Sequence, residues 1–470
     1  MSNSNKPRRK PHHMDFSQSR FDNVPPVLMP NVTAKGYVDI LKEARWNNDY
    51  RVELTKEYLG AESINDVVYA DYRCSLATAL VLRYILPDFF ESKGLKIDKI
   101  SCVESDGDYA ASFSAIEIAP GKTENRLVYG DYFVSNAEGQ HYIVHLEESY
   151  PDSFRIKFGA KHDTVPSAST LSDEMVKYGE DHNFLKGQKI DPNCNFVKFN
   201  RKFTWDDLIL SDKLKTEIQM NLKNLIEYRE IYKKNGLQVK RGLILAGEPG
   251  TGKTVLAKIL CNTIDWTFVW VTSKNLENAK RVAQIVELCR DLSPAVLFLE
   301  DIDLFGGSRE SNHNPMLLGE LLNQLDGVEE NTDIIVIGST NNKEVLEKAL
   351  VSRPGRFDKV IDFPLPEENE RLQMLKVFSN GLLAGDLPYL EKIAQNYDKK
   401  TGAQIRELVN MAIIFAVDEK SYGEDKQLII KESHFKKAMK AVEGKDFKTV
   451  TGFSTGQYSS LGSKFDDMDD

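Results

Sequence analysis

The chain has 470 residues, of which 41% are hydrophobic, and its formal net charge is −10. This length allows about three domains, and the apolar fraction is large enough for buried cores. The acidic balance argues against a non-specific nucleic-acid binder, and no segment approaches the roughly 18 consecutive apolar residues of a membrane span. Five cysteines without metal-ligand spacing, and an N-terminus without a signal-peptide core, favour the cytoplasm.

The first part of the chain has the composition of a tail followed by a mixed domain. Residues 1–29 are rich in Asn, Ser, Pro and charge, so a disordered N-terminal tail is expected. Residues 30–195 are expected to form an α+β domain. A helical pattern covers residues 75–86, and Pro87 is expected to end this helix. Four segments with the composition of strands follow, at residues 109–118, 127–134, 142–146 and 154–158.

Turn residues between these four segments predict an antiparallel meander. The last part of the domain, residues 165–195, is rich in Pro, Ser, Asp and Asn and is expected to be an irregular connector. No motif in residues 30–195 indicates chemistry. The expected role of this N-terminal domain is therefore recognition of a partner or adaptor, which is inferred from its position alone.

From residue 200 onward, helical patterns alternate with short apolar strands. The strands are expected at residues 243–246, 268–271, 296–299, 334–337 and 360–361. Five such strands separated by helices predict a parallel, doubly wound sheet over residues 200–365. Helical patterns fill residues 366–450 and predict a small helical domain. The acidic, Ser/Gly-rich segment 451–470 is expected to be a disordered tail.

The strand predicted at residues 243–246 leads into a motif of the form G-x-x-x-x-G-K-[ST]. The motif consists of Gly247, Glu248, Pro249, Gly250, Thr251, Gly252, Lys253 and Thr254, and Val255 follows at the start of a predicted helix. In this context the backbone N–H groups of the turn and the helix N-terminus bind phosphate. Lys253 is expected to reach the β- and γ-phosphates, and Thr254 to ligate Mg²⁺. The alternative is a glycine-rich turn with an incidental lysine, but the flanking strand and helix favour binding of ATP or GTP.

A second apolar strand ends in acids. Glu300 and Asp301 follow residues 295–299 directly, and Asp303 comes close behind. Beside a P-loop strand, one carboxylate supports Mg²⁺ through its water shell, and a second orients or deprotonates the attacking water. Acids at the end of a strand also serve as ordinary helix N-caps. Their spacing from the P-loop favours the catalytic interpretation.

Three further polar residues are candidates for the same site. Asn341 follows the strand at residues 334–337, and between the P-loop and acid strands it would hold the attacking water or the γ-phosphate. Alone, this asparagine is an ordinary turn residue. Arg353 and Arg356 are of the type that stabilises charge on a transferring phosphoryl group. The alternative for the two arginines is a solvated surface turn.

Together these motifs resemble the AAA clade of the AAA+ ATPases over roughly residues 203–442. Further strings match that family in its order: the segment before the P-loop (203–209), the inter-subunit signalling segment (321–327), sensor 1 (339–341), the arginine-finger segment (353–358) and the start of the lid helix (401–403). The resemblance implies an α/β fold, a P-loop doubly wound parallel sheet with a C-terminal helical lid domain. Here it is preceded by the α+β N-terminal domain.

The resemblance also implies an ATPase that uses ATP and Mg²⁺. Glu300 would join Thr254 around Mg²⁺, and Asp301 would act on the attacking water. Arg353 and Arg356 would act on ATP in a neighbouring subunit, which implies a homo-oligomeric ring, usually a hexamer. Outside the P-loop, the residues that the resemblance places at the nucleotide are Leu208, Ile209, Gly402 and Ala403.

Three features depart from the pattern of the family. The acid pair reads Glu300-Asp301 rather than Asp-Glu, an order that resembles the branch that translocates the mitochondrial Rieske protein. Residues 271–280 lack the aromatic–aliphatic–glycine loop of threading members, which argues against hand-over-hand threading. Gln404 replaces the usual acid of sensor 2, and Arg406 lies one position beyond that motif, so it is given no catalytic role. No H-E-x-x-H sequence is present, so a fused zinc protease is not expected.

The expected function is ATP-driven remodelling of an unknown protein partner that the N-terminal domain recruits to an oligomeric ring. The alternative is an ATP-gated scaffold or sensor with slow hydrolysis, which the Glu300-Asp301 order and the missing loop favour somewhat. A nucleic-acid motor is disfavoured by the net charge and by the lack of interleaved aromatic and basic residues.

Overall fold

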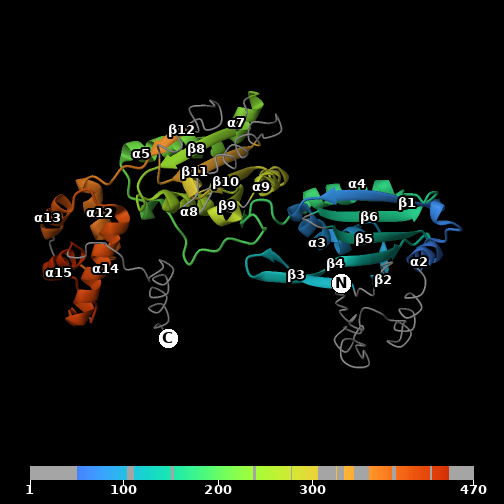
Figure 1. Cartoon of the computed structure of the whole chain (residues 1–470), viewed down its shortest axis with the longest axis horizontal. Helices are drawn as coiled ribbons and strands as arrows, with labels where there is room; N and C mark the ends of the chain where they lie inside the picture. Colours follow the sequence, from blue (N-terminus) through green and yellow to red (C-terminus); the bar gives the residue numbers. More distant parts are fainter. Residues whose placement is uncertain are drawn as a thin grey trace, which may run out of the picture. The chain divides into compact units, whose positions relative to one another are not determined.

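The protein is described here by a computed structural model, which divides into two compact units, one ending at Lys198 and the other beginning at Phe199 (Figure 1). The residues that the structure describes are 50–102, 111–149, 153–236, 240–276, 278–304, 324, 333–342, 359–383, 388–423 and 426–443. Among them, no helix has both the length and the apolar character needed to span a membrane.

The first unit is built on an antiparallel sheet. Its elements are α2 (Tyr50–Leu59), η2 (Ile64–Asp66), β1 (Val67–Cys74), α3 (Leu76–Ser92), β2 (Lys96–Ser101), β3 (Ser112–Ala119), β4 (Lys122–Ser135), β5 (His141–Ser149), β6 (Ser153–Lys161), α4 (Ala168–Asp181) and β7 (Lys189–Ile190). The strand order is β1-β6-β5-β4-β2, and β3 pairs with β4. Strands β3 to β6 pair with their sequence neighbours in antiparallel register, so the predicted meander is confirmed.

The two faces of this sheet are covered by different helices. Helix α3 packs against one face, where Phe90 meets Tyr132 with ring centroids 5.4 Å apart. Phe133 is the next residue of β4, so its side chain points to the opposite face, where Tyr58 of α2 contacts it at 4.9 Å. Helix α4 packs beside α3 and contacts β1 and β6. The unit is therefore an α+β domain with its larger core beneath α3 and α4.

Two predictions for this unit are wrong. Helix α3 does not end at Pro87 but continues through it to Ser92. The residues after the proline include Phe89 and Phe90, which are fully buried, and this burial offsets the cost of about 3 kcal/mol for a proline inside a helix. The segment expected to be an irregular connector contains α4, a helix of 14 residues capped by Ser167.

The second unit contains a parallel sheet flanked by helices. Its first elements are η3 (Trp205–Asp207), α5 (Asp212–Ile218), the short π-helix η4 (Gln219–Lys223), α6 (Asn224–Glu227), α7 (Arg229–Lys234), β8 (Lys240–Ala246), α8 (Lys253–Thr263), β9 (Thr267–Val271), η5 (Ser273–Asn275), α9 (Ala279–Asp291), β10 (Ala295–Leu299), η6 (Ile302–Leu304), β11 (Ile334–Thr340) and β12 (Lys359–Asp362). Within the unit these strands lie in the order β12-β8-β11-β10-β9, and every pair in this series is parallel. The five predicted strands and the doubly wound sheet are confirmed.

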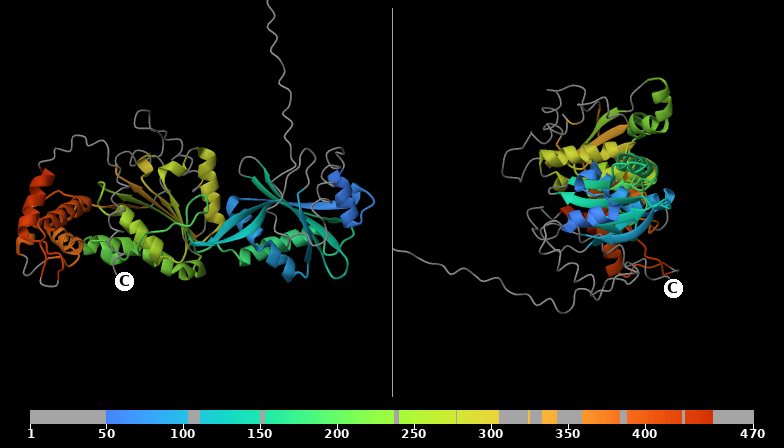
Figure 2. Two further views of the ribbon diagram at one scale, coloured as in Figure 1. Left: turned by 90° about the horizontal axis from the view of Figure 1, so that it is seen from below. Right: turned by 90° about the vertical axis from the view of Figure 1, so that its right-hand side faces the viewer.

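The connections of this sheet place its helices on both faces. The chain crosses from β8 through α8 to β9, and returns through α9 to β10. Right-handed crossovers in opposite directions put α8 and α9 on opposite faces, as Figure 2 shows. Strands β9, β10 and β11 are buried along their whole length, which explains their continuous apolar sequences.

The C-terminal part of the second unit is a helical domain. Its helices are α12 (Glu368–Phe378), α13 (Pro388–Asn396), α14 (Gly402–Asp418) and α15 (Glu432–Glu443). Their shared core includes Leu390, Leu408 and Phe435, which are fully buried, and also Ile209 from the segment before α5. The lid domain therefore packs against Ile209, which lies near the beginning of the second unit in the sequence.

Candidate nucleotide site

The candidate site lies where the carboxyl ends of β8, β10 and β11 meet. Strand β11 runs between β8 and β10, so the predicted position of Asn341 between the P-loop and acid strands is confirmed. Because parallel strands share one carboxyl edge, the P-loop after β8 and the acids after β10 approach each other there. Residues far apart in the sequence thus form one cluster.

The turn between β8 and α8 has the backbone that phosphate binding requires. Gly250 has φ of 84° and Gly252 has φ of 109°, both in the left-handed region that favours glycine. Gly252 is also the N-cap of α8, and Lys253 is the first helical residue. The free N–H groups of this helix end and its dipole favour an anion.

Lys253 lies inside its own loop. Its Nζ donates to the carbonyl oxygens of Gly247 at 2.6 Å and Glu248 at 2.9 Å, and the residue is only 5% exposed. Burial lowers the pKa of Lys253 below its ordinary value, while Asp301 and Asp303 act to raise it. The Lys253 ammonium is therefore partly desolvated and lies within the electrostatic influence of acidic side chains. Phosphate oxygens that replace water at this ammonium would bind it strongly.

Thr254 and Glu300 bring hard oxygen ligands together. Thr254 Oγ1 donates to Glu300 Oε1 at 3.1 Å, across from α8 to the end of β10. The other carboxylate oxygen, Oε2, accepts a hydrogen bond from Trp270 Nε1 at 3.2 Å. A hydroxyl and a carboxylate beside a phosphate-binding turn fit the ligand preference of Mg²⁺.

Asp301 is held in a strained backbone conformation at the end of β10. Its φ is 52°, and its N–H donates to Ser339 Oγ at 3.0 Å. Asn341 Nδ2 donates to Asp301 Oδ1 at 3.1 Å. Burial, followed by the charges of Glu300 and Asp303, raises the pKa of Asp301 above its ordinary value, although Lys253 and Asn341 act against this. A raised pKa suits a carboxylate that accepts a proton.

Asp303 is bound differently from Asp301. Its Oδ1 accepts hydrogen bonds from Thr340 Oγ1 at 2.9 Å and from the Asn341 N–H at 3.2 Å. These bonds tie η6 to the end of β11. Asp303 therefore holds η6 against the end of β11. Asp301 remains the better candidate for accepting a proton from the attacking water.

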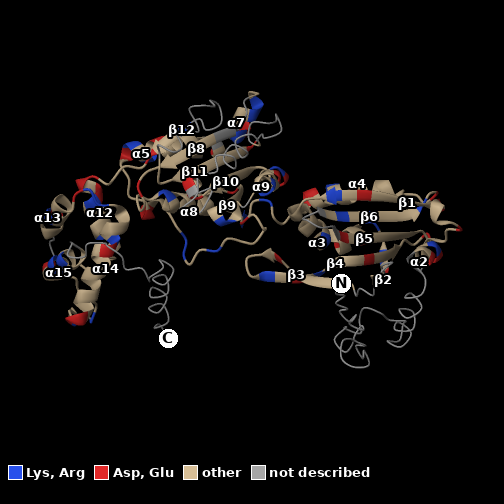
Figure 3. Ribbon diagram, viewed as in Figure 1, with Lys and Arg blue, Asp and Glu red and all other residues tan. Residues whose placement is uncertain are grey.

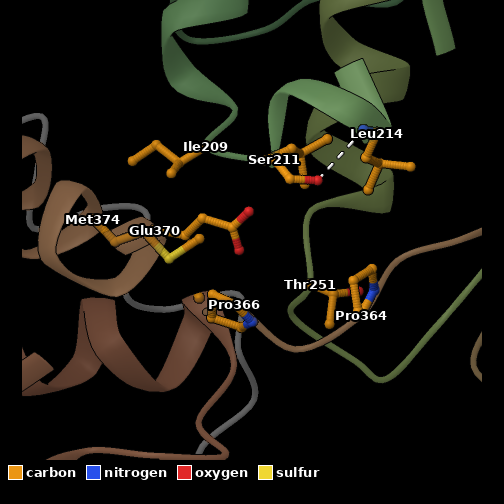
Figure 4. Close-up of a pocket in the computed structure, with 10 residues that line it drawn as sticks. Ile209, Ser211, Leu214, Thr251, Pro364, Pro366, Glu370 and Met374 are labelled. Carbon is orange, nitrogen blue, oxygen red and sulfur yellow. Dashed lines mark hydrogen bonds between the residues drawn. The ribbon is translucent and has the colours of Figure 1, made fainter. Parts of the chain in front are cut away.

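A pocket opens beside the P-loop, between the segment before α5 and the lid (Figure 4). Its lining is mostly apolar and consists of Ile209, Leu210, Ser211, Leu214, Thr251, Pro364, Pro366, Glu370, Met374 and Gly402. Figure 4 shows the Glu370 carboxylate directed into the space among these side chains. Burial raises the pKa of Glu370, against the lowering effect of a hydrogen bond from the Glu367 N–H. An apolar slot with few polar groups suits a planar base next to a phosphate site.

The start of the lid helix touches the P-loop directly. Ala403 N–H donates to Gly250 O at 3.2 Å, and Gly402 lines the pocket. Leu208 packs on the other side of the turn, where a Cβ on Gly252 would meet Leu208 Cδ1 at 2.8 Å. The structure thus brings Leu208, Ile209, Gly402 and Ala403 to the loop that the sequence motif predicts for phosphate.

Comparison with known proteins agrees with this geometry. Residues 243–365 match the family described as "ATPase family associated with various cellular activities (AAA)". The chain is 31% identical over 369 residues to the 26S proteasome regulatory subunit 4 homolog of Oryza sativa, covering 76% of this chain and 78% of that protein. The chain belongs to the AAA family of ATPases. As an AAA ATPase it hydrolyses ATP and uses Mg²⁺, for which the phosphate turn and the Thr254–Glu300 oxygens are suited.

Other relatives share mainly the ATPase part. The chain is 32% identical over 257 residues to the proteasome-activating nucleotidase of Methanopyrus kandleri, covering 52% of this chain and 57% of that protein. It is 33% identical over 235 residues to the ATP-dependent zinc metalloprotease FtsH of Mycoplasmopsis pulmonis, covering 46% of this chain and 32% of that protein. The chain thus spans about a third to three quarters of the length of these relatives.

Several predicted parts of the AAA site lie outside the described residues. These include Arg353 and Arg356, and all of the signalling segment 321–327 except Gln324. The other P-loop residues are placed: Glu248 and Pro249 are exposed, Thr251 is buried, and Val255 lies in the first turn of α8. The roles of the two arginines stay predictions.

In the sensor 2 region of this AAA ATPase, Gln404 takes part in the N-terminal cap of α14. Gln404 Oε1 accepts from the Thr401 N–H at 2.9 Å, and Thr401 Oγ1 accepts from the Gln404 N–H at 3.3 Å. This capping box fixes the start of α14. Arg406 lies over the Phe378 ring at 4.4 Å, and it interacts electrostatically with Arg201 and Asp207, which lie before the P-loop. That it has no catalytic role stays a prediction.

Sequence reasoning missed some residues of the site. The hydrogen bond from Trp270 to Glu300 was not predicted, and Ser339 was not singled out beside Asp301. Glu370 and Met374 were not identified as pocket residues because no motif marks them. The one local signal was Glu367 followed three residues later by Glu370, the pattern of a capping box at a helix start.

Proposed function

We propose that this AAA ATPase remodels a protein partner, that it works as a homo-oligomeric ring, usually a hexamer, and that its first unit recruits the partner. The observation that carries the proposal is the extent of the match to the proteasome regulatory subunit homolog. The match covers 369 residues, which is longer than the whole second unit, residues 199–470. The similarity therefore reaches into the first unit.

The names of the other relatives agree with a protein substrate. One is a proteasome-activating nucleotidase and another is an ATP-dependent metalloprotease. Nucleic acid is not proposed as the substrate, because Figure 3 shows Lys and Arg interspersed with Asp and Glu over the described elements. A single-sign basic face is the usual mark of a protein that binds the phosphate backbone.

The arrangement at the strand ends supports a specific division of labour in hydrolysis. Thr254 and Glu300 would hold Mg²⁺, which when bound neutralises charge on the phosphate oxygens. Lys253 would bind the same phosphates from inside the loop. Asp301 would accept a proton from the attacking water, and Asn341 would orient Asp301 and the water together.

The second candidate function, an ATP-gated scaffold with slow hydrolysis, is favoured by the segment between β9 and α9. Threading members have an aromatic loop here, according to the resemblance. In this chain Thr272 and Asn275 form a capping box around η5, and Leu276 is buried. The segment is thus folded onto its own unit, which disfavours a grip on a substrate chain.

ATP turnover per subunit, measured against protein concentration, separates the two candidates. A ring ATPase gives a steep rise as chains assemble, whereas a scaffold gives near-zero turnover despite tight ATP binding. Partner capture then tests remodelling: Asp301→Asn with ATP should retain a bound protein that the wild-type chain releases on hydrolysis. Lys253→Ala, which should not bind ATP, is the control that should capture nothing. Equal capture by all three chains would contradict ATP-driven remodelling.

A further inference from the structure

The Glu300 carboxylate has two defined hydrogen-bond partners, one on each oxygen. Thr254 Oγ1 donates to Oε1 at 3.1 Å, and Trp270 Nε1 donates to Oε2 at 3.2 Å. The first partner belongs to the P-loop and is a candidate Mg²⁺ ligand. The second is a tryptophan on the neighbouring strand, for which the motifs of the family provide no role.

The register of the sheet places the Trp270 indole beside Glu300. Trp270 of β9 pairs with Phe298 of β10, and Glu300 N–H donates to Val271 O at 2.8 Å. Residues 298 and 300 point to the same face of the strand, so the indole lies diagonally opposite the carboxylate. The N–H therefore reaches Glu300 without distorting the sheet.

Aromatic neighbours fix the orientation of this indole. Its ring lies 4.6 Å from that of Phe298, 5.7 Å from Phe199 and 6.0 Å from Phe268, and Trp270 is only 9% exposed. A buried indole N–H needs an acceptor, and here the acceptor is Glu300 Oε2. The tryptophan is thus a rigid donor rather than a mobile one.

We propose that Trp270 is a positioning residue that holds Glu300 in the orientation required for Mg²⁺–ATP. Glu is one methylene longer than the Asp that the family usually has here, so its carboxylate has one more torsion to fix. The Trp270 bond fixes Oε2, and this leaves Oε1 directed at Thr254. The proposal deepens the ATPase site and rests on its chemistry, not on the proposed remodelling of a partner.

Trp270→Phe tests the proposal because it keeps the aromatic packing and removes the N–H. ATP binding is measured with mant-ATP, a fluorescent ATP analogue, at increasing Mg²⁺ and separately in EDTA, without turnover. The Mg²⁺ concentration at half-maximal effect should rise about tenfold or more, as for other groups that orient a metal ligand. In EDTA, the affinity for mant-ATP should stay within about twofold of the wild-type value. This change is much smaller than the roughly tenfold rise expected in the Mg²⁺ concentration at half-maximal effect.

Trp266→Phe is the matched control. Trp266 directly precedes β9, is 8% exposed, and has the Arg229 guanidinium 5.9 Å from its ring centroid. This variant makes the same chemical change next to the same strand but should not shift the Mg²⁺ dependence. A Trp270→Phe chain with lowered thermal stability but an unchanged Mg²⁺ midpoint would reduce Trp270 to a packing residue and overturn the proposal.

A double mutant tests whether the two residues act together. Against a Glu300→Asp background, Trp270→Phe should add little to the Mg²⁺ shift, because both changes act through one carboxylate. A measurement without the substitution keeps the proposal testable if Trp270→Phe folds poorly. In the unmutated chain carrying 5-fluorotryptophan, one of the four tryptophan ¹⁹F signals should move when Mg²⁺ is added to the ATP-bound protein. We expect this signal to belong to Trp270. It is assigned by replacing the other tryptophans one at a time, because the Trp270 signal is then present in every variant. Additive shifts, or no Mg²⁺-dependent signal from Trp270, would contradict the proposal.

Discussion

Asn341 Nδ2 donates a hydrogen bond to Asp301 Oδ1 over 3.1 Å and so joins the ends of β11 and β10. Asp301 receives a second constraint from the same strand, because its N–H donates to Ser339 Oγ at 3.0 Å. These bonds hold an aspartate whose φ of 52° is unfavourable for a residue with a side chain. Strain that is retained by two bonds at the edge of a nucleotide site is consistent with a functional position.

The first prediction concerns the identity of the general base. Asp301→Asn should retain ATP binding and reduce turnover by about 10²- to 10⁴-fold, the usual contribution of a positioned base. The measurement is single-turnover hydrolysis alongside mant-ATP affinity. Asp303→Asn is the matched control, since its Oδ1 already accepts bonds from Thr340 and Asn341 and its loss should cost less. If Asp303→Asn is the more damaging change, the two acids have been assigned in the wrong order.

The second prediction concerns pH. Turnover requires the ionised Asp301, so activity should fall as pH falls through its pKa, which lies above the ordinary aspartate range. The Asn341 hydrogen bond lowers this pKa, so Asn341→Ala should move the acid limb to higher pH, besides lowering the maximal rate. A profile of kcat against pH for both chains measures the displacement. An unmoved acid limb in Asn341→Ala would assign the limb to another group.

The chemistry of the site was predictable from the sequence, whereas its supporting contacts were not. The P-loop and Glu300-Asp301 follow apolar strands, and carboxyl ends of parallel strands meet by the rules of the fold. The Trp270–Glu300 bond depends instead on which residue of β9 lies opposite Phe298. A one-residue change in register would turn the indole to the other face, and apolar strands do not specify register in their sequence.

The pocket and the first unit illustrate the same limit. The pocket combines residues before α5, in the P-loop and in α12, so no single segment carries its signature. In the first unit, the helix through Pro87 is stabilised by tertiary burial of Phe89 and Phe90, which overrides a local signal for a helix end. Helix α4 was missed because its Leu171 and Met175 form a short apolar stripe among polar residues.

The third prediction concerns the contact between the P-loop and the lid. A Cβ on Gly250 would lie 2.6 Å from Ala403 Cβ and 3.0 Å from Thr401 Oγ1. Gly250→Ala should therefore push the start of α14 away and weaken ATP binding by about tenfold, or 1.4 kcal/mol. Gly381→Ala is the control, since Gly381 has φ of 75° and nothing within 4 Å of the added Cβ.

Both alanines bear a similar backbone strain of about 1–2 kcal/mol, so thermal stability should fall in each variant. Only Gly250→Ala should lose nucleotide affinity, measured by mant-ATP titration. A loss of affinity in both variants would indicate that backbone strain alone, rather than contact with the lid, is responsible.

The fourth prediction concerns the arginine-finger segment, which lies outside the described residues. Arg353→Ala should leave ATP binding intact and lower turnover by about 10³-fold or more, the range for a finger that stabilises a transferring phosphoryl group. Purified Arg353→Ala and Asp301→Asn chains should each be nearly inactive alone. The first lacks the finger for its neighbour but has an intact acid pair, and the second has the opposite defect.

Mixing the two variants tests whether the finger acts between subunits. In a mixed ring, an Arg353→Ala subunit can receive the arginine of an Asp301→Asn neighbour, which completes one site. Turnover should therefore rise to a maximum at intermediate mixing ratios. As a control, chains with both Lys253→Ala and Arg353→Ala replace the Arg353→Ala chains in the mixture. This mixture should show no rise, because the double-mutant site cannot bind ATP. Because complementation requires two chains at one site, a flat response across all ratios would place Arg353 within its own subunit's site and remove the main argument for a catalytic ring.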